Sequence, residues 1–150
     1  MPIKYDIHFQ PAAPEEQHGT RVFTFGFKAS LKVAGPQALV NRWVKTLMTP
    51  KGSNPLDKAE GTAFGNLIGS NVSRRHRDVE DVLLLSIEDA NEQVKRQDLI
   101  GMFPANERLV NATLLENEGR TWEDGFEIWV RIVNVVGQVL TTRLMDLADR

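Results

Sequence analysis

Histidine, cysteine and serine most often carry metal binding or nucleophilic catalysis, and their arrangement in this chain favours neither. The three histidines, His8, His18 and His76, are far apart and stand in no H-x-x-x-H spacing. The chain has no cysteine, which excludes disulfides, cysteine-ligated zinc and thiol catalysis. It also has no G-x-S-x-G sequence and no glycine pattern of a nucleotide-binding loop. We therefore expect no metal, no cofactor and no catalytic nucleophile.

Paired carboxylates are a second possible chemistry, because two acids that flank a sugar bond can hydrolyse it. Twenty acids occur among the 150 residues, so such pairs also arise by coincidence. The acids available near the expected C-terminal strands are Glu107, Glu116, Glu118 and Asp124. Nothing around them marks one as a proton donor. The chain is thus predicted not to be an enzyme, and a peptidoglycan-degrading lysozyme is the less favoured alternative.

The densest charge is basic and occupies residues 73–77, Ser-Arg-Arg-His-Arg. Acids follow it at once, and this mixture favours a solvated loop. A further interpretation is that an acidic protein surface docks there, so Arg74, Arg75 and Arg77 are candidate protein-binding residues. Over the whole chain, 18 Lys and Arg stand against 20 Asp and Glu. A nucleic-acid binder is normally strongly basic, so we expect no nucleic-acid partner.

Length and composition indicate one α+β domain. The chain has the size of a single typical domain, with 41% hydrophobic and 25% charged residues. No run approaches the roughly 20 apolar residues of a membrane span, so no membrane contact is expected. The predicted fold is a mixed or antiparallel sheet with an N-terminal hairpin and a C-terminal hairpin, packed against two to three helices.

Hydrophobic periodicity and the positions of proline and glycine predict the elements in the first two thirds of the chain. Alternation at 3–9 and 21–33 predicts the N-terminal hairpin, with a loop at 11–19 that we expect to be disordered without a partner. Pro36 opens a helix that ends at about Met48, and a short helix is expected at 64–68. The longest helix is expected at 78–97. Its outward residues are predicted to be Glu80, Asp81, Glu88, Glu92 and Lys95.

Two strands are expected to close the domain, at 109–115 and 126–140, with a turn at 117–120 between them. The second is apolar on both faces, so it lies centrally under helices or is covered by another subunit. Residues 142–150 are expected to be a short helix or a frayed tail.

Several segments match a known family in their order. Residues 38–52 read A-L-V-N-R-W-V-K-T-L-M-T-P-K-G, a helix that runs into a Leu-x-Thr-x-x-Gly turn. Gly61, the short helix, the long helix and then Asn106-Glu107-Arg108-Leu109 follow. This order resembles the baseplate-wedge and sheath-initiator family of contractile-tailed phages and type VI secretion systems. The family carries Glu-Pro-Arg where this chain has Glu107 and Arg108 adjacent. The resemblance covers residues 36–140, so 35–150 is taken as the family core of a single domain 1–150, and 1–34 as an N-terminal extension.

The resemblance implies a structural function. Members of the family sit on the wedge core of the baseplate and offer strands onto which the first ring of sheath subunits adds. The implied partners are the baseplate wedge core proteins and the tail sheath protein, in a virion assembled in the bacterial host cytoplasm. Glu107 and Arg108 would contact the helical core of the wedge. Another small tail protein, such as a tail terminator or completion factor, is an alternative.

Overall fold

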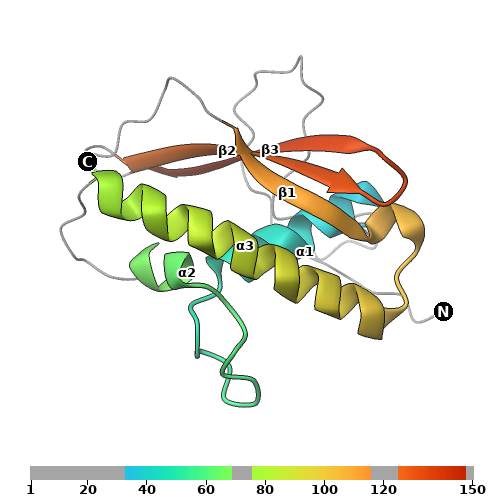
Figure 1. The fold of residues 1–150 in the computed structure, drawn as a ribbon, viewed down its shortest axis with the longest axis horizontal. Coiled ribbons are helices and arrows are strands. Elements are labelled where there is room, and N and C mark those ends of the chain that lie inside the picture. The colour runs from blue at the N-terminus through green and yellow to red at the C-terminus, as the bar shows by residue number, and fades with distance from the viewer. Residues whose placement is uncertain (1–32, 69–75, 116–124, 148–150) are drawn as a thin grey trace.

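The computed structural model describes residues 33–68, 76–115 and 125–147, which form helices packed on a three-stranded sheet (Figure 1). The elements are α1 (Pro36–Met48), α2 (Ala63–Ile68), α3 (His76–Gly101), the 3-10 turn η2 (Ala105–Glu107), β1 (Leu109–Leu115), β2 (Gly125–Asn134) and β3 (Val139–Leu147). The α+β class is confirmed, and β1 and β2, the strands of the expected C-terminal hairpin, pair antiparallel. The expected N-terminal hairpin, its loop at 11–19 and the turn at 117–120 lie outside the described residues.

The sheet has the order β1-β2-β3 and is antiparallel throughout. The single strand expected at 126–140 is wrong, because the chain turns between Asn134 and Val139 and returns as β3. Asn134 makes this turn: its backbone N–H donates to the Gln138 carbonyl at 3.1 Å, and its side-chain oxygen accepts from the Gln138 N–H at 2.8 Å. The helix or tail expected at 142–150 is also wrong, since β3 continues to Leu147.

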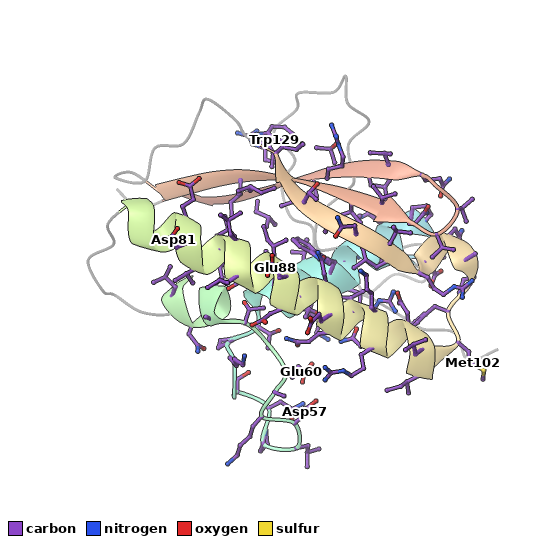
Figure 2. All side chains as sticks on the ribbon, in the orientation of Figure 1. Asp57, Glu60, Asp81, Glu88, Met102 and Trp129 are labelled. Carbon is purple, nitrogen blue, oxygen red and sulfur yellow. The ribbon has the colours of Figure 1, made fainter. Side chains whose placement is uncertain are left out.

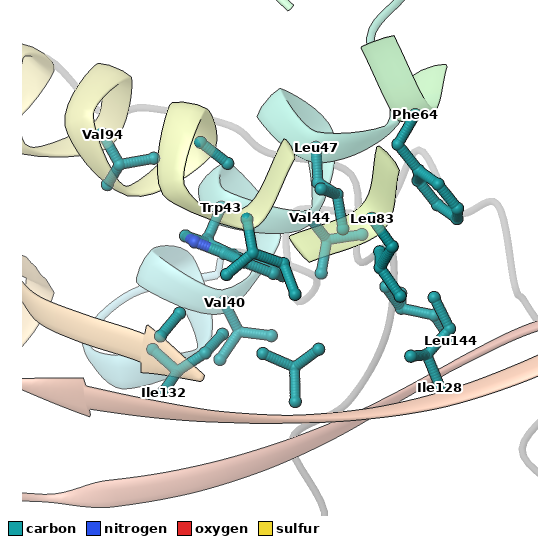
Figure 3. Packing of buried hydrophobic residues seen from close by; sticks show 14 of the residues in the cluster. Val40, Trp43, Val44, Leu47, Phe64, Leu83, Val94, Ile128, Ile132 and Leu144 are labelled. Carbon is teal, nitrogen blue, oxygen red and sulfur yellow. The ribbon is translucent and has the colours of Figure 1, made fainter. Parts of the chain in front are cut away.

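Helices α1 and α3 cover one face of the sheet, with α1 passing behind α3 in Figure 1. Trp43 on α1 is fully buried, and its indole N–H donates to the side-chain oxygen of Asn91 on α3 at 2.8 Å. The Asn91 amide in turn donates to the Ala112 carbonyl of β1 at 2.9 Å. One polar side chain thus joins both helices to the sheet inside the apolar core. Among the core residues, Figure 3 labels Val40, Trp43, Val44, Leu47, Phe64, Leu83, Val94, Ile128, Ile132 and Leu144.

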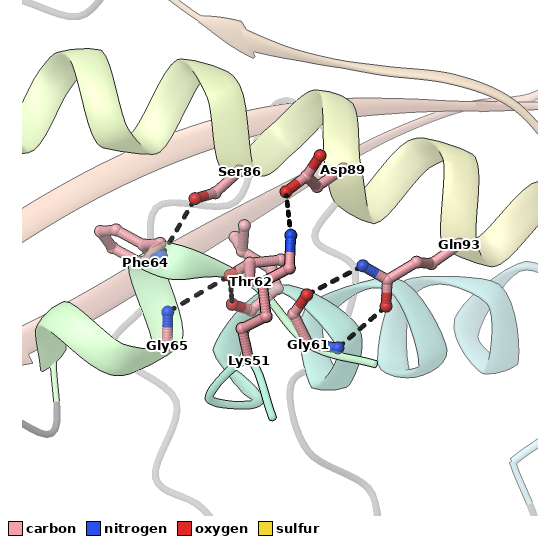
Figure 4. Close-up of polar contacts among 9 residues, drawn as sticks. Lys51, Gly61, Thr62, Phe64, Gly65, Ser86, Asp89 and Gln93 are labelled. Carbon is pink, nitrogen blue, oxygen red and sulfur yellow. Dashed lines mark hydrogen bonds and ion pairs between the residues drawn. The ribbon is translucent and has the colours of Figure 1, made fainter. Parts of the chain in front are cut away.

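The turn after α1 is fixed against α2 and α3 by hydrogen bonds (Figure 4). The Thr62 hydroxyl donates to the Leu47 carbonyl at 2.6 Å, and the Thr62 N–H donates to the Thr49 carbonyl at 2.9 Å. The Gln93 side chain on α3 binds both backbone groups of Gly61, accepting from its N–H at 2.9 Å and donating to its carbonyl at 2.8 Å. The Leu-x-Thr-x-x-Gly segment and Gly61 are therefore part of one structural joint.

Two glycines allow this joint to close. Gly61 has φ +92°, and a Cβ there would lie 2.5 Å from the Thr49 carbonyl oxygen. Gly65, inside α2, would also bring a Cβ into contact with that same oxygen. Both positions require the absence of a side chain, Gly61 for its backbone angle as well as for space.

We expect Gly65→Ala to lower the free energy of unfolding by about 1–3 kcal/mol, because the added methyl group overpacks against the Thr49 carbonyl. In a helix without this contact the same substitution would raise stability by about 1 kcal/mol, so the sign of the change reports the close approach. Urea denaturation measures it. Asn66→Ala, at the next and exposed position of α2, is the control and should stay within about 0.5 kcal/mol. A Gly65→Ala protein as stable as the parent would contradict the close approach.

Candidate protein-binding site

A buried arginine organises the region in which the sequence placed its candidate pair, Glu107 and Arg108. Arg42 projects from α1, and its side chain is 15% exposed. Its NH2 atom lies 2.6 Å from Asp98 Oδ1 and donates to the Glu107 carbonyl at 2.5 Å. The guanidinium carbon sits 3.8 Å from the centre of the Phe103 ring, a cation–π contact. Arg42 therefore binds the end of α3, the following turn and η2 at once.

Asp98 links Arg42 to the first strand of the sheet. It is 8% exposed on the last turns of α3. While Oδ1 faces Arg42, Oδ2 accepts from the backbone N–H of Leu109, the first residue of β1, at 2.8 Å. Oδ1 thus forms the ion pair and Oδ2 the hydrogen bond of this buried carboxylate. The start of β1 is held against the end of α3 by this one side chain.

Glu107 is used inside the chain. Its Oε1 atom accepts from the backbone N–H of Gly35 at 2.7 Å, immediately before α1 begins at Pro36. A carboxylate at a helix N-terminus meets the positive end of the helix dipole. Burial lowers the pKa of the Arg42 guanidinium, and the charges of Asp98 and Glu107 partly offset this by favouring its charged form. Glu107 thus acts on α1 and on Arg42.

Arg108 differs from its neighbour, because its side chain is exposed. Its backbone is nevertheless held on both sides: its N–H donates to the Ala105 carbonyl at 3.3 Å, and its carbonyl accepts from the Val135 N–H at 3.0 Å. The structure thus separates the two adjacent candidates, with Glu107 turned to α1 and Arg108 on the surface. A fixed backbone that carries an exposed guanidinium suits recognition of a carboxylate, which arginine can bind through two parallel hydrogen bonds.

The basic segment is only partly described. Arg74 and Arg75 lie outside the described residues, and Arg77 lies in the first turn of α3, where the backbone but not the side chain is described. Docking of an acidic partner on these three arginines remains a prediction.

Of the four acids considered for glycoside hydrolysis, Glu107 alone lies in the part of the chain that the structure describes. Glu116, Glu118 and Asp124 fall in the gap at 116–124. Within 33–68, 76–115 and 125–147, no three His, Cys, Asp or Glu side chains come close enough to hold a metal ion. No helix among these residues is both long and apolar enough to cross a membrane.

The sequence did not reveal the parts played by Arg42, Asp98 and Phe103. One signal was present for Asp98. The inward stripe of α3 includes Ala90 and Val94, and the next position at the same spacing is an acid, which must be paired if it is buried. For its partner Arg42 on α1 the sequence holds no comparable signal, because the ion pair joins two helices that are far apart in the chain.

Comparison with known protein families, curated proteins and solved structures finds no match in any of the three.

We expect Asp98→Ala to lower the free energy of unfolding by about 3–5 kcal/mol, because it leaves the Arg42 charge buried and unpaired. The substitution also removes the acceptor of the Leu109 N–H. Denaturant unfolding followed by circular dichroism measures the loss. The matched control is Asp89→Ala, also on α3, whose pair with Lys51 is 3.5 Å long and exposed on both sides. Such surface pairs contribute at most about 1 kcal/mol.

The double substitution Arg42→Met with Asp98→Leu removes both charges, and we expect it to cost less than Asp98→Ala alone. Equal losses for Asp98→Ala and Asp89→Ala would contradict the buried ion pair.

Proposed function

We propose that this chain is a non-enzymatic structural component of a contractile phage tail baseplate, which binds the wedge core and starts assembly of the tail sheath. The observation that carries the proposal is the placement of Arg108: an exposed guanidinium on a backbone held at both of its hydrogen-bonding groups. The partners would be baseplate wedge core proteins and the tail sheath protein, and the protein would act in the virion after assembly in the bacterial host cytoplasm.

The segments that resemble the family support this proposal through what they do in the fold. Thr49 and Gly61 belong to the joint that fixes α1 against α2 and α3. Glu107 holds the start of α1 through Gly35. These residues position elements and leave Arg108 free to meet a partner carboxylate. In this arrangement Glu107 is a positioning residue and Arg108 the residue in contact with the wedge.

The sheet offers a second means of contact. β2 lies between β1 and β3, so among the described residues no other strand pairs with the outer edges of β1 and β3. Open edges in a monomer favour aggregation, whereas in an assembly they accept a strand from a partner through main-chain hydrogen bonds. An added strand of the sheath subunit would use such an edge.

We expect Arg108→Glu to leave the protein folded and to weaken its binding to the wedge core proteins by about 30-fold or more, since reversing one charge of an interfacial pair costs about 2–5 kcal/mol. Copurification of the full chain with coexpressed wedge proteins measures incorporation, and circular dichroism reports folding. Lys58→Glu, the same reversal in the exposed segment between α1 and α2, is the control and should bind as the parent does. Normal incorporation of Arg108→Glu would remove Arg108 from the interface.

The same preparations separate the alternatives. A tail terminator or completion factor would copurify with the far end of the tail instead of with the wedge. A lysozyme would clear cell-wall substrate as a purified protein and would lose that activity when one acid is replaced.

A further inference from the structure

Six exposed residues at alternating spacings of three and four follow the outer face of α3 and end at Met102, the first residue after the helix. They are Leu85, Glu88, Glu92, Lys95, Leu99 and Met102, and all six are exposed. This is the spacing with which a helix packs along another helix. The helix buries its opposite face against α1 and the sheet, so these six residues form a second stripe along the same element. Figure 2 shows Glu88 on α3 and Met102 beyond its C-terminal end.

The stripe is apolar at both ends and charged in the middle. Leu85 is 66% exposed, Leu99 85% and Met102 90%. Between them, Glu88 and Glu92 precede Lys95. The ion pairs formed among the described residues are Arg42–Asp98 and Lys51–Asp89, and neither involves the stripe. None of its three charges therefore forms an ion pair with another described residue.

The order of charged and apolar residues along the stripe complements itself when a second copy of the stripe runs in the opposite direction. If a second α3 lies antiparallel with its centre between residues 93 and 94, Glu92 faces Lys95 of the second copy, and Leu85 faces its Met102. The twofold axis repeats each contact, giving two ion pairs in the middle and an apolar contact at each end. Glu88 then lies beside Leu99 of the second copy, one helical turn from its Lys95. We propose that two copies of this chain pair antiparallel through this face of α3.

The backbone at Met102 is a separate observation in favour of a contact. Met102 has φ +46°, a left-handed conformation usually taken by glycine after a helix. At this position the chain nevertheless displays a large apolar side chain to solvent. Next to it, the Phe103 ring packs over Gly101 and leaves no room there for a Cβ. The turn holds Met102 outward at the end of the stripe, where burial by a second copy would remove its apolar surface from water.

Charge pattern favours a second copy over an unrelated partner. A partner surface of one sign would be repelled by part of the stripe, since acids and a base share it. An antiparallel copy offers the opposite sign at Glu92 and at Lys95. This inference does not rest on the proposed baseplate function, and it is tested on the isolated protein.

Sedimentation equilibrium of the full chain, from micromolar to near-millimolar concentration, is the experiment. We expect a reversible dimer that weakens as salt is raised. Glu92→Lys and Lys95→Glu each turn both central ion pairs into like-charge contacts, and each should weaken dimerisation about tenfold or more. An equimolar mixture of the two single variants restores opposite charges across the axis and should dimerise again. The double variant Glu92→Lys with Lys95→Glu should dimerise like the parent.

Recovery in the mixture excludes misfolding as the cause of the single-variant defects. Lys58→Glu, remote from α3 in sequence and exposed, is the charge control and should leave dimerisation unchanged. A monomer at every concentration would overturn the proposal. A dimer that neither single variant weakens, or a mixture that stays monomeric, would also overturn it.

Discussion

The guanidinium of Arg42 is a largely buried charge, and the chain between α3 and β1 supplies the groups that compensate it. Removing a cation from water costs several kcal/mol unless opposite charge and hydrogen-bond acceptors replace the lost hydration. Asp98 supplies the charge, Phe103 a ring face and Glu107 a carbonyl oxygen. Because these three partners follow one another along ten residues, the chain must fold back after α3 and lay η2 against the start of α1. The second oxygen of Asp98 then fixes where β1 begins.

Helix α1 is held at its C-terminal end by the joint formed with Gly61 and Gly65. There the Thr49 carbonyl packs against Gly61 and Gly65, and Gln93 binds both backbone groups of Gly61. Between the two ends, Trp43 is bonded to Asn91 in the core. α1 is therefore tied to its neighbours by polar contacts along its whole length, in addition to its apolar stripe. Residues engaged in this way are less available to a partner, whereas Arg108 and the outer face of α3 are exposed.

Elements that depend on nearby residues, such as helix starts and single strands, were predicted well from the sequence. Pro36 begins α1, and strand β1 matches the expected range 109–115. The β2–β3 turn was missed because Val133, Val135, Val136 and Val139 continue the apolar run through it, and only Asn134 and Gly137 mark a turn there. The site was predicted less well, since it depends on contacts between distant residues. Glu107 and Arg108 are adjacent, yet the change from 3-10 to extended backbone after Glu107 sends one side chain to Gly35 and leaves the other exposed.

The two proposed contact surfaces are positioned by one turn, and this determines how they affect each other. Phe103, stacked on Arg42, immediately follows Met102 at the end of the α3 stripe, and Arg42 also binds η2, which precedes Arg108. Conformational coupling between two sites requires a second state that one ligand prefers. Both surfaces are formed in this arrangement, so neither contact requires the turn to change. We therefore expect dimerisation to affect wedge binding sterically, through the size of the partners.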